Sequence, residues 1–73
     1  MKDIREVHFT DINKNAKIRK RLQDVSKNGT MTIQGILDVA CGIYDCEIPS
    51  DILDIEWNMI VNELMFNLRE ANV

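Results

Sequence analysis

The sequence predicts a small all-α domain, and three observations support this fold class. The 73 residues contain three segments in which apolar residues recur at the helical period of about 3.6 residues. Residues that cap or break helices separate these segments. No segment shows a period-2 alternation as long as these helical patterns. We therefore expect one domain over residues 1–73, with helices at 11–28, 32–46 and 50–70 and an extended N-terminal arm.

The N-terminal segment alternates only weakly between its two sides. One side carries Arg5, Val7 and Phe9, and the other carries Ile4, Glu6 and His8. Because a lone strand needs a partner, we expect either a short strand or an extended arm that lies on the helices. The alternative fold class is α+β, with a short strand pair at 4–10 and 30–35.

The first helical pattern follows Thr10 and Asp11, either of which can cap a helix. Its apolar positions, spaced i, i+4 and i+7, are Ile18, Leu22 and Val25. The opposite side is basic, so the pattern predicts an amphipathic helix.

The dipeptide Asn28-Gly29 ends this pattern, and glycine suits the left-handed position that follows a helix. Asn-Gly is also a strong hairpin signal, with 25–27 and 30–33 as possible arms. We favour the helix because its period-3.6 pattern is the longer one.

The second helical pattern begins after Thr30 or Thr32 and extends to about Cys46. Its main apolar stripe consists of Ile33, Ile36, Leu37, Ala40, Ile43 and Tyr44. Gly35 and Gly42 are seven residues apart and share one face, where we expect another helix to approach closely. Each glycine costs up to about 1 kcal/mol relative to alanine inside a helix.

The third helical pattern follows Ile48-Pro49, which breaks the chain, and Ser50 or Asp51 can cap it. This pattern has two apolar sectors. The wide sector consists of Leu53, Trp57, Ile60, Val61, Leu64 and Leu68, and the narrow sector consists of Ile52, Ile55, Met59 and Phe66. One apolar sector is enough to dock a surface helix, so two sectors imply burial from both sides.

The narrow sector is the candidate protein interface. A domain of this size has a small core, and small domains are often reinforced by oligomerisation. Three short helices cannot easily bury both sectors of the third helix. We therefore expect Ile52, Ile55, Met59 and Phe66 to contact a protein partner or a second copy of the chain.

The charge of the chain is divided between its two parts. Residues 1–28 carry eight basic and four acidic side chains, a net +4, whereas residues 29–73 carry one basic and eight acidic side chains, a net −7. The whole chain has a formal charge of −3. This asymmetry indicates an electrostatic partner for one part, or a basic and an acidic element packed together.

The basic side of the first helix is the candidate nucleic-acid contact. It consists of Lys14, Lys17, Lys20, Arg21 and Lys27. Such a stripe can neutralise phosphates, which gives salt-sensitive binding. However, it lacks interleaved aromatic residues for stacking on single strands, and the helix that follows is too apolar to contact bases. We therefore favour a stripe that is solvated or paired with the acidic part of the chain.

Catalytic and ligand-binding motifs are missing from the sequence. His8 is the only histidine and lies in no nucleophile or metal motif. Asp51 and Asp54 suit the first turn of a helix, where the dipole favours carboxylates. The other carboxylates are too scattered to favour mimicry of a phosphate backbone, and the glycines are too widely spaced for a phosphate-binding loop. We expect no enzyme activity, no cofactor and no metal.

Cys41 and Cys46 are the only cysteines. If both lie on one helix, they point about 140° apart, which is too divergent for an easy disulfide. A charged leader with an apolar core is missing, as is an apolar run of about 18 residues, so we expect a cytoplasmic protein with reduced thiols and no membrane segment. The isoleucine-rich composition resembles that of proteins from AT-rich genomes, such as those of low-GC bacteria or phages.

The sequence therefore favours a small non-enzymatic regulatory or inhibitory protein that binds a protein partner and self-associates through apolar helix surface. The alternative is a nucleic-acid-binding regulator that uses the basic side of helix 11–28.

Overall fold

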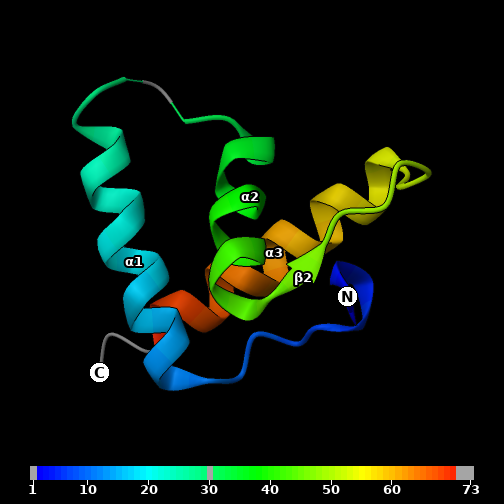
Figure 1. Ribbon diagram of the computed structural model, residues 1–73, viewed down its shortest axis with the longest axis horizontal. Helices are drawn as coiled ribbons and strands as arrows, with labels where there is room; N and C mark the ends of the chain where they lie inside the picture. Colours follow the sequence, from blue (N-terminus) through cyan, green and yellow to red (C-terminus); the bar gives the residue numbers. More distant parts are fainter. Residues whose placement is uncertain (1, 30, 71–73) are drawn as a thin grey trace.

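The computed structural model describes residues 2–29 and 31–70. These residues form three α-helices, which are α1 (Ile12–Ser26), α2 (Ile33–Tyr44) and α3 (Asp54–Glu70). In Figure 1, α1 and α2 lie side by side and α3 crosses behind them. The predicted all-α class with three helices is confirmed.

The first residues of the chain add a small strand pair. Strand β1 (Lys2–Asp3) pairs in parallel with β2 (Cys46–Glu47), in the register Lys2 to Cys46 and Asp3 to Glu47. The alternative fold class placed its strands elsewhere, at 4–10 and 30–35. A 3-10 turn η1 (Ile4–Glu6) occupies part of the first range, and α2 begins within the second, whose residue 30 lies outside the described residues.

The helix starts follow the capping rule. Asp11, rather than Thr10, caps α1, since its carboxylate accepts hydrogen bonds from the backbone N–H groups of Asn13 (3.0 Å) and Lys14 (3.1 Å). Thr32 caps α2 by accepting from the N–H of Gly35 at 3.0 Å. The other cap proposed for α2, Thr30, lies outside the described residues.

The observed helix bounds differ from the predicted ones by at most four residues, and the end of α3 at residue 70 agrees with the prediction. Helix α1 stops at Ser26, and Gly29 has a φ of 153°, a backbone conformation that glycine adopts readily. The hairpin interpretation of this turn is wrong, because helices flank it on both sides. Helix α3 begins at Asp54 instead of residue 50. At this observed start, the N–H of Leu53 donates to the Glu56 carboxylate at 2.9 Å.

Helix α2 ends at Tyr44 instead of Cys46. Asp45 adopts a left-handed conformation (φ 58°, ψ 51°), and its N–H donates to the carbonyl of Cys41. Aspartate is one of the few residues that tolerate this conformation. The chain then reverses into β2, which places Cys46 outside the helix.

The expected close approach of a helix to the two glycines of α2 is wrong. A Cβ atom added at Gly42 would meet nothing within 4 Å. One added at Gly35 would meet only the side chains of Thr32 and Met31, which immediately precede α2. Within the described residues, these glycines therefore do not serve helix packing.

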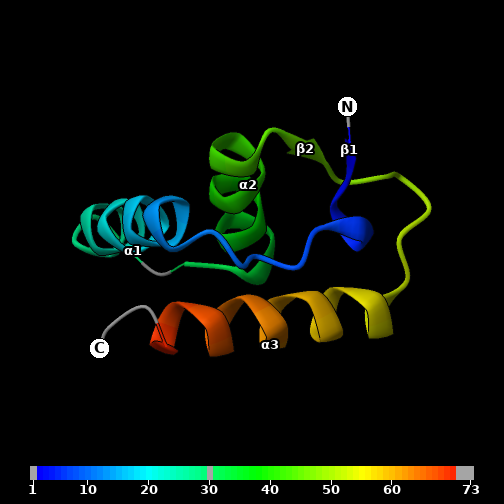
Figure 2. The ribbon, with the colours of Figure 1, turned by 90° about the horizontal axis from the view of Figure 1, so that it is seen from below.

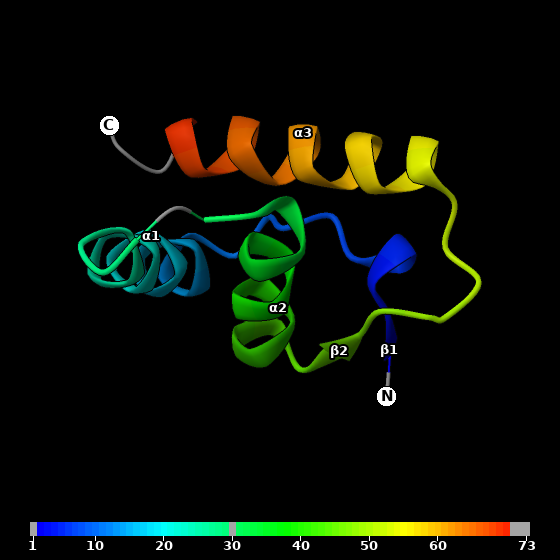
Figure 3. The same ribbon diagram turned by 90° about the horizontal axis from the view of Figure 1, so that it is seen from above.

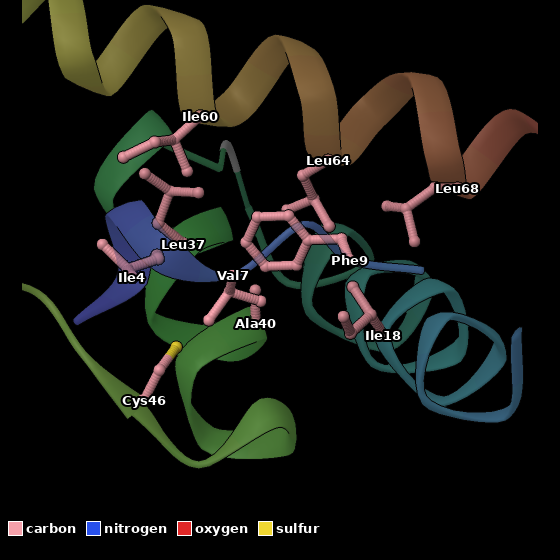
Figure 4. Close-up of a cluster of buried hydrophobic side chains, with 10 residues drawn as sticks. All are labelled: Ile4, Val7, Phe9, Ile18, Leu37, Ala40, Cys46, Ile60, Leu64 and Leu68. Carbon is pink, nitrogen blue, oxygen red and sulfur yellow. The ribbon is translucent and has the colours of Figure 1, made fainter. Parts of the chain in front are cut away.

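The N-terminal arm is part of the core. It runs between α3 and the layer formed by α1 and α2, as Figures 2 and 3 show from opposite sides. Ile4, Val7 and Phe9 are buried there among side chains from all three helices. Figure 4 shows this core, whose buried members are Ile4, Val7, Phe9, Ile18, Leu37, Ala40, Cys46, Ile60, Leu64 and Leu68. Each fully buried large apolar side chain contributes about 1.5–3 kcal/mol.

Candidate interaction surface

Helix α3 has an apolar face that points away from the core. Its buried face carries Ile60, Leu64 and Leu68. On the opposite side Ile55, Met59 and Phe66 remain 66%, 65% and 60% exposed. Their spacing of i, i+4 and i+11 places them on one line along the helix, about 16 Å long at about 1.5 Å per residue. We call these three residues the outer face of α3.

The structure does not place Ile52 on this outer face. Ile52 precedes α3 in a turn in which its N–H donates to the carbonyl of Pro49 at 3.4 Å, and it is partly buried against the core. The helical periodicity that grouped it with Ile55 does not extend into this turn. The described elements leave the outer face uncovered, and Figures 2 and 3 both show α3 at one edge of the molecule.

One flank of the outer face is acidic and is bound to the N-terminal arm. Glu56 accepts from the guanidinium of Arg5 at 3.4 Å, and Glu63 lies 3.2 Å from Nδ1 of His8. A shallow groove of about 220 Å³ runs between the arm and the helix here, and Met59 contributes to its lining. The outer face is therefore continuous with a groove whose carboxylates have partners within the chain.

The other flank of the outer face carries no carboxylate between residues 58 and 69. It consists of Asn58, Asn62, Met65 and Arg69. Met65 is 43% exposed and extends the apolar surface to this side. The exposed apolar strip thus has an acidic border and a neutral to basic border.

Arg5 organises the end of the arm that faces α3. Its guanidinium binds Asp3 through Nη2 at 2.6 Å and Nε at 3.1 Å, and it also lies 3.7 Å from Asp51. The hydrogen bonds from the Arg5 side chain and backbone hold the pKa of Asp3 below its usual value. Arg5 therefore links β1 to the acidic start of α3.

A polar anchor fixes the other end of the arm. Phe9 has a left-handed φ of 53°, which is unusual for a bulky residue, and its carbonyl accepts from the side-chain amide of Asn15 at 2.9 Å. Asn15 is only 2% exposed. The Tyr44 hydroxyl donates to Oδ1 of Asn15 at 2.6 Å and accepts from the N–H of Asp11 at 3.1 Å. We call Asn15 and Tyr44 the polar anchor.

The aromatic ring of Tyr44 completes this arrangement. It packs edge-to-face on Phe9, with ring centroids 5.2 Å apart and planes at 82°. Burial raises the pKa of the Tyr44 hydroxyl, so this group keeps its proton. The anchor could not be predicted from local periodicity, because it joins residues 29 positions apart in the chain. A polar residue such as Asn15 beside the apolar stripe of α1 was the available signal.

The predicted basic stripe divides into two parts in the structure. Lys14 is half-buried, and its ammonium lies 5.2 Å from the centroid of the Tyr44 ring, so it contributes to packing. The remaining members are exposed, and they are Lys17, Lys20, Arg21 and Lys27. Within the described part of the chain these four form no ion pair with the acidic helices, so the interpretation that they pair with the acidic part is not supported.

Three of the exposed cations, Lys17, Lys20 and Arg21, line an open groove between α1 and α2. One part of this groove, of about 370 Å³, is lined by Arg21, Asp38, Val39, Gly42 and Ile43. The adjoining part, of about 340 Å³, is lined by Lys17, Lys20, Arg21, Asp24 and Ile43. Asp24 and Asp38 lie within it, so its charge is mixed rather than uniformly basic.

Comparison of the chain with protein-family models, curated proteins and solved structures finds no match. Among the residues that the structure describes, no three or more His, Cys, Asp or Glu side chains are grouped so as to hold a metal ion. None of the helices in this part of the chain is long and apolar enough to span a membrane.

Proposed function

We propose that the protein is a small, non-enzymatic regulatory protein that binds other proteins through the outer face of α3, and that a second copy of the chain occupies this face. The observation that carries the proposal is the alignment of Ile55, Met59 and Phe66, each about two-thirds exposed, opposite the buried face of one helix. Aligned apolar side chains with a methionine and an aromatic residue are favoured at protein interfaces.

The sequence of α3 suits pairing with an identical helix in the antiparallel direction. Four apolar or amide side chains follow one another along this side of α3 at positions 55, 59, 62 and 66. Their spacing of four, three and four residues reads the same from either end of the helix, so two antiparallel copies present matching positions to each other. A two-fold axis between 59 and 62 would set Ile55 against Phe66 of the second copy. Isologous contacts of this kind are the commonest route to a dimer.

Charge complementarity supports the same arrangement. In the antiparallel pair Arg69 of one copy lies near the start of the other α3, where Asp51 and Asp54 are exposed. The positive end of each helix dipole also meets the negative end of the other. On the acidic flank, the guanidinium of Arg5 within each copy pairs with Glu56, which reduces the repulsion between the carboxylates of the two copies.

Sedimentation velocity over a range of concentrations tests the proposal. Because the outer face is short, we expect a dimer with a dissociation constant in the micromolar range, at the weak end for specific interfaces. The double variant Met59→Gln and Phe66→Gln should be monomeric with unchanged helix content. The control is Ile12→Gln, since Ile12 is 70% exposed on α1, and this change should leave the dimer intact. A wild-type monomer at high concentration would contradict self-association.

A nucleic-acid-binding regulator is the second candidate. The observation that favours it is the set of four exposed cations, three on α1 and Lys27 directly after it, which have no ion-pair partner within the described residues. The carboxylates in the adjoining groove weaken it, because they would repel a phosphate backbone. Binding to duplex DNA that weakens steeply with salt would distinguish it from the first proposal.

A further inference from the structure

The two cysteines lie together in the fold. Cys41 belongs to the last turn of α2, and Cys46 is the first residue of β2. Their sulfur atoms are 3.3 Å apart, and both thiols are free. Two residues at positions 41 and 46 of one helix would diverge by about 140°, but Cys46 lies outside α2, which ends at Tyr44.

The backbone between the cysteines holds this arrangement. The left-handed Asp45 reverses the chain, and its N–H donates to the carbonyl of Cys41. Cys46 then pairs with Lys2 across the strand pair, which fixes its backbone. Figure 4 shows the Cys46 sulfur pointing from β2 toward the core. The sulfur pair is therefore held by a capped helix end on one side and a strand pair on the other.

We propose that Cys41 and Cys46 form a reversible dithiol–disulfide site that is oxidised by a low-molecular-weight disulfide such as oxidised glutathione. Cys41 is half-buried and Cys46 is only 4% exposed, so Cys41 is the thiol that the reagent reaches. This site is separate from the outer face of α3 and does not depend on the proposed self-association.

The reaction proceeds by two thiol–disulfide exchanges. The deprotonated sulfur of Cys41 attacks one sulfur of oxidised glutathione, which forms a mixed disulfide and releases one glutathione thiolate. The deprotonated sulfur of Cys46 then attacks the sulfur of Cys41, which forms the protein disulfide and releases the second glutathione thiolate. The two protein thiols lose two electrons and two protons, and oxidised glutathione becomes two molecules of glutathione.

Burial controls the rate of this reaction. Burial, together with the contact with Cys46, raises the pKa of the Cys41 thiol to about 12. Burial also raises the pKa of Cys46. Since the thiolate is the nucleophile, oxidation should be slow at neutral pH and about tenfold faster for each pH unit up to the pKa of the attacking thiol.

The test equilibrates the full chain in buffers of oxidised and reduced glutathione and measures the intact mass after acid quenching. The wild type should lose two hydrogens and retain no glutathione. The Cys46→Ala variant should instead hold one glutathione at Cys41, because the resolving thiol is missing. The Cys41→Ala variant should react more slowly than Cys46→Ala, because Cys46 is buried. Circular dichroism verifies that each variant is folded.

The folded and urea-unfolded wild type provide the quantitative comparison, which needs no substitution. Because the fold holds the sulfur atoms together, the oxidation equilibrium constant should be at least about tenfold larger in the folded chain. Two bound glutathiones on the folded wild type, a disulfide between chains, or an equal or smaller constant in the folded state would each overturn the proposal.

Discussion

Removal of the Tyr44 hydroxyl tests whether the polar anchor holds the arm in the core. The variant Tyr44→Phe keeps the ring that packs on Phe9 and removes only the oxygen that joins Asn15 to Asp11. The N–H of Asp11 is exposed and can bind water instead. Oδ1 of Asn15 lies in a residue that is 2% exposed, so it loses its donor without replacement.

A buried acceptor left without a donor costs about 1–3 kcal/mol. We therefore expect Tyr44→Phe to lower the free energy of unfolding by about 1–3 kcal/mol, measured by urea denaturation with an unchanged m-value. In a domain of this size each kcal/mol lowers the midpoint of thermal unfolding by roughly 4–8 °C. The stability of small domains is modest, so this loss is easily detected.

A double-mutant cycle with Asn15→Ala separates the hydrogen bond from general effects of each change. Because the two side chains share one hydrogen bond of 2.6 Å, the double variant should lose about 1 kcal/mol less than the sum of the single variants. A loss below about 0.5 kcal/mol for Tyr44→Phe, or additive losses in the cycle, would refute the role of the anchor.

Two further predictions concern charge and pH. Replacing Lys17, Lys20 and Arg21 with glutamine should change the free energy of unfolding by less than about 1 kcal/mol, because exposed charges contribute little. Titration of the wild type with duplex DNA should show no tight binding at physiological salt. Tight binding would favour the second candidate function if each removed cation reduced the magnitude of the log–log salt slope by about 0.9. The pKa of Cys41 is raised from an ordinary value of 9.0 to about 12 in the folded chain. Between these two pH values the folded state keeps a proton that the unfolded state loses. Stability should therefore fall as pH rises from about 9 toward 12, and denaturation midpoints should show a smaller fall in Cys41→Ala.

The helices and their faces were predictable because they depend on local periodicity. The spacing of Ile18 and Leu22 on α1, and of Ile60 and Leu64 on α3, identified the buried sides correctly. Ile55, Met59 and Phe66 were likewise assigned to a separate face of α3, which the structure leaves exposed.

The features that could not be predicted from the sequence depend on contacts between distant residues or on single backbone conformations. The arm enters the core through Phe9, whose carbonyl needs Asn15, which in turn needs Tyr44. The local pattern shows that Asn15 is a polar residue beside an apolar stripe, but it does not identify Phe9 and Tyr44 as its partners. The left-handed conformation of Asp45 ends α2 early and brings Cys46 back to Cys41, whereas the apolar pattern alone continues through both positions.

The most direct test of the central claim is a dilution series followed by backbone and methyl NMR. We expect concentration-dependent chemical-shift changes centred on Ile55, Met59 and Phe66, with no comparable changes on α1. The double variant Met59→Gln and Phe66→Gln should abolish them while leaving the signals of the core unchanged. Spectra that do not change with concentration, or changes centred on the cations of α1, would contradict the account.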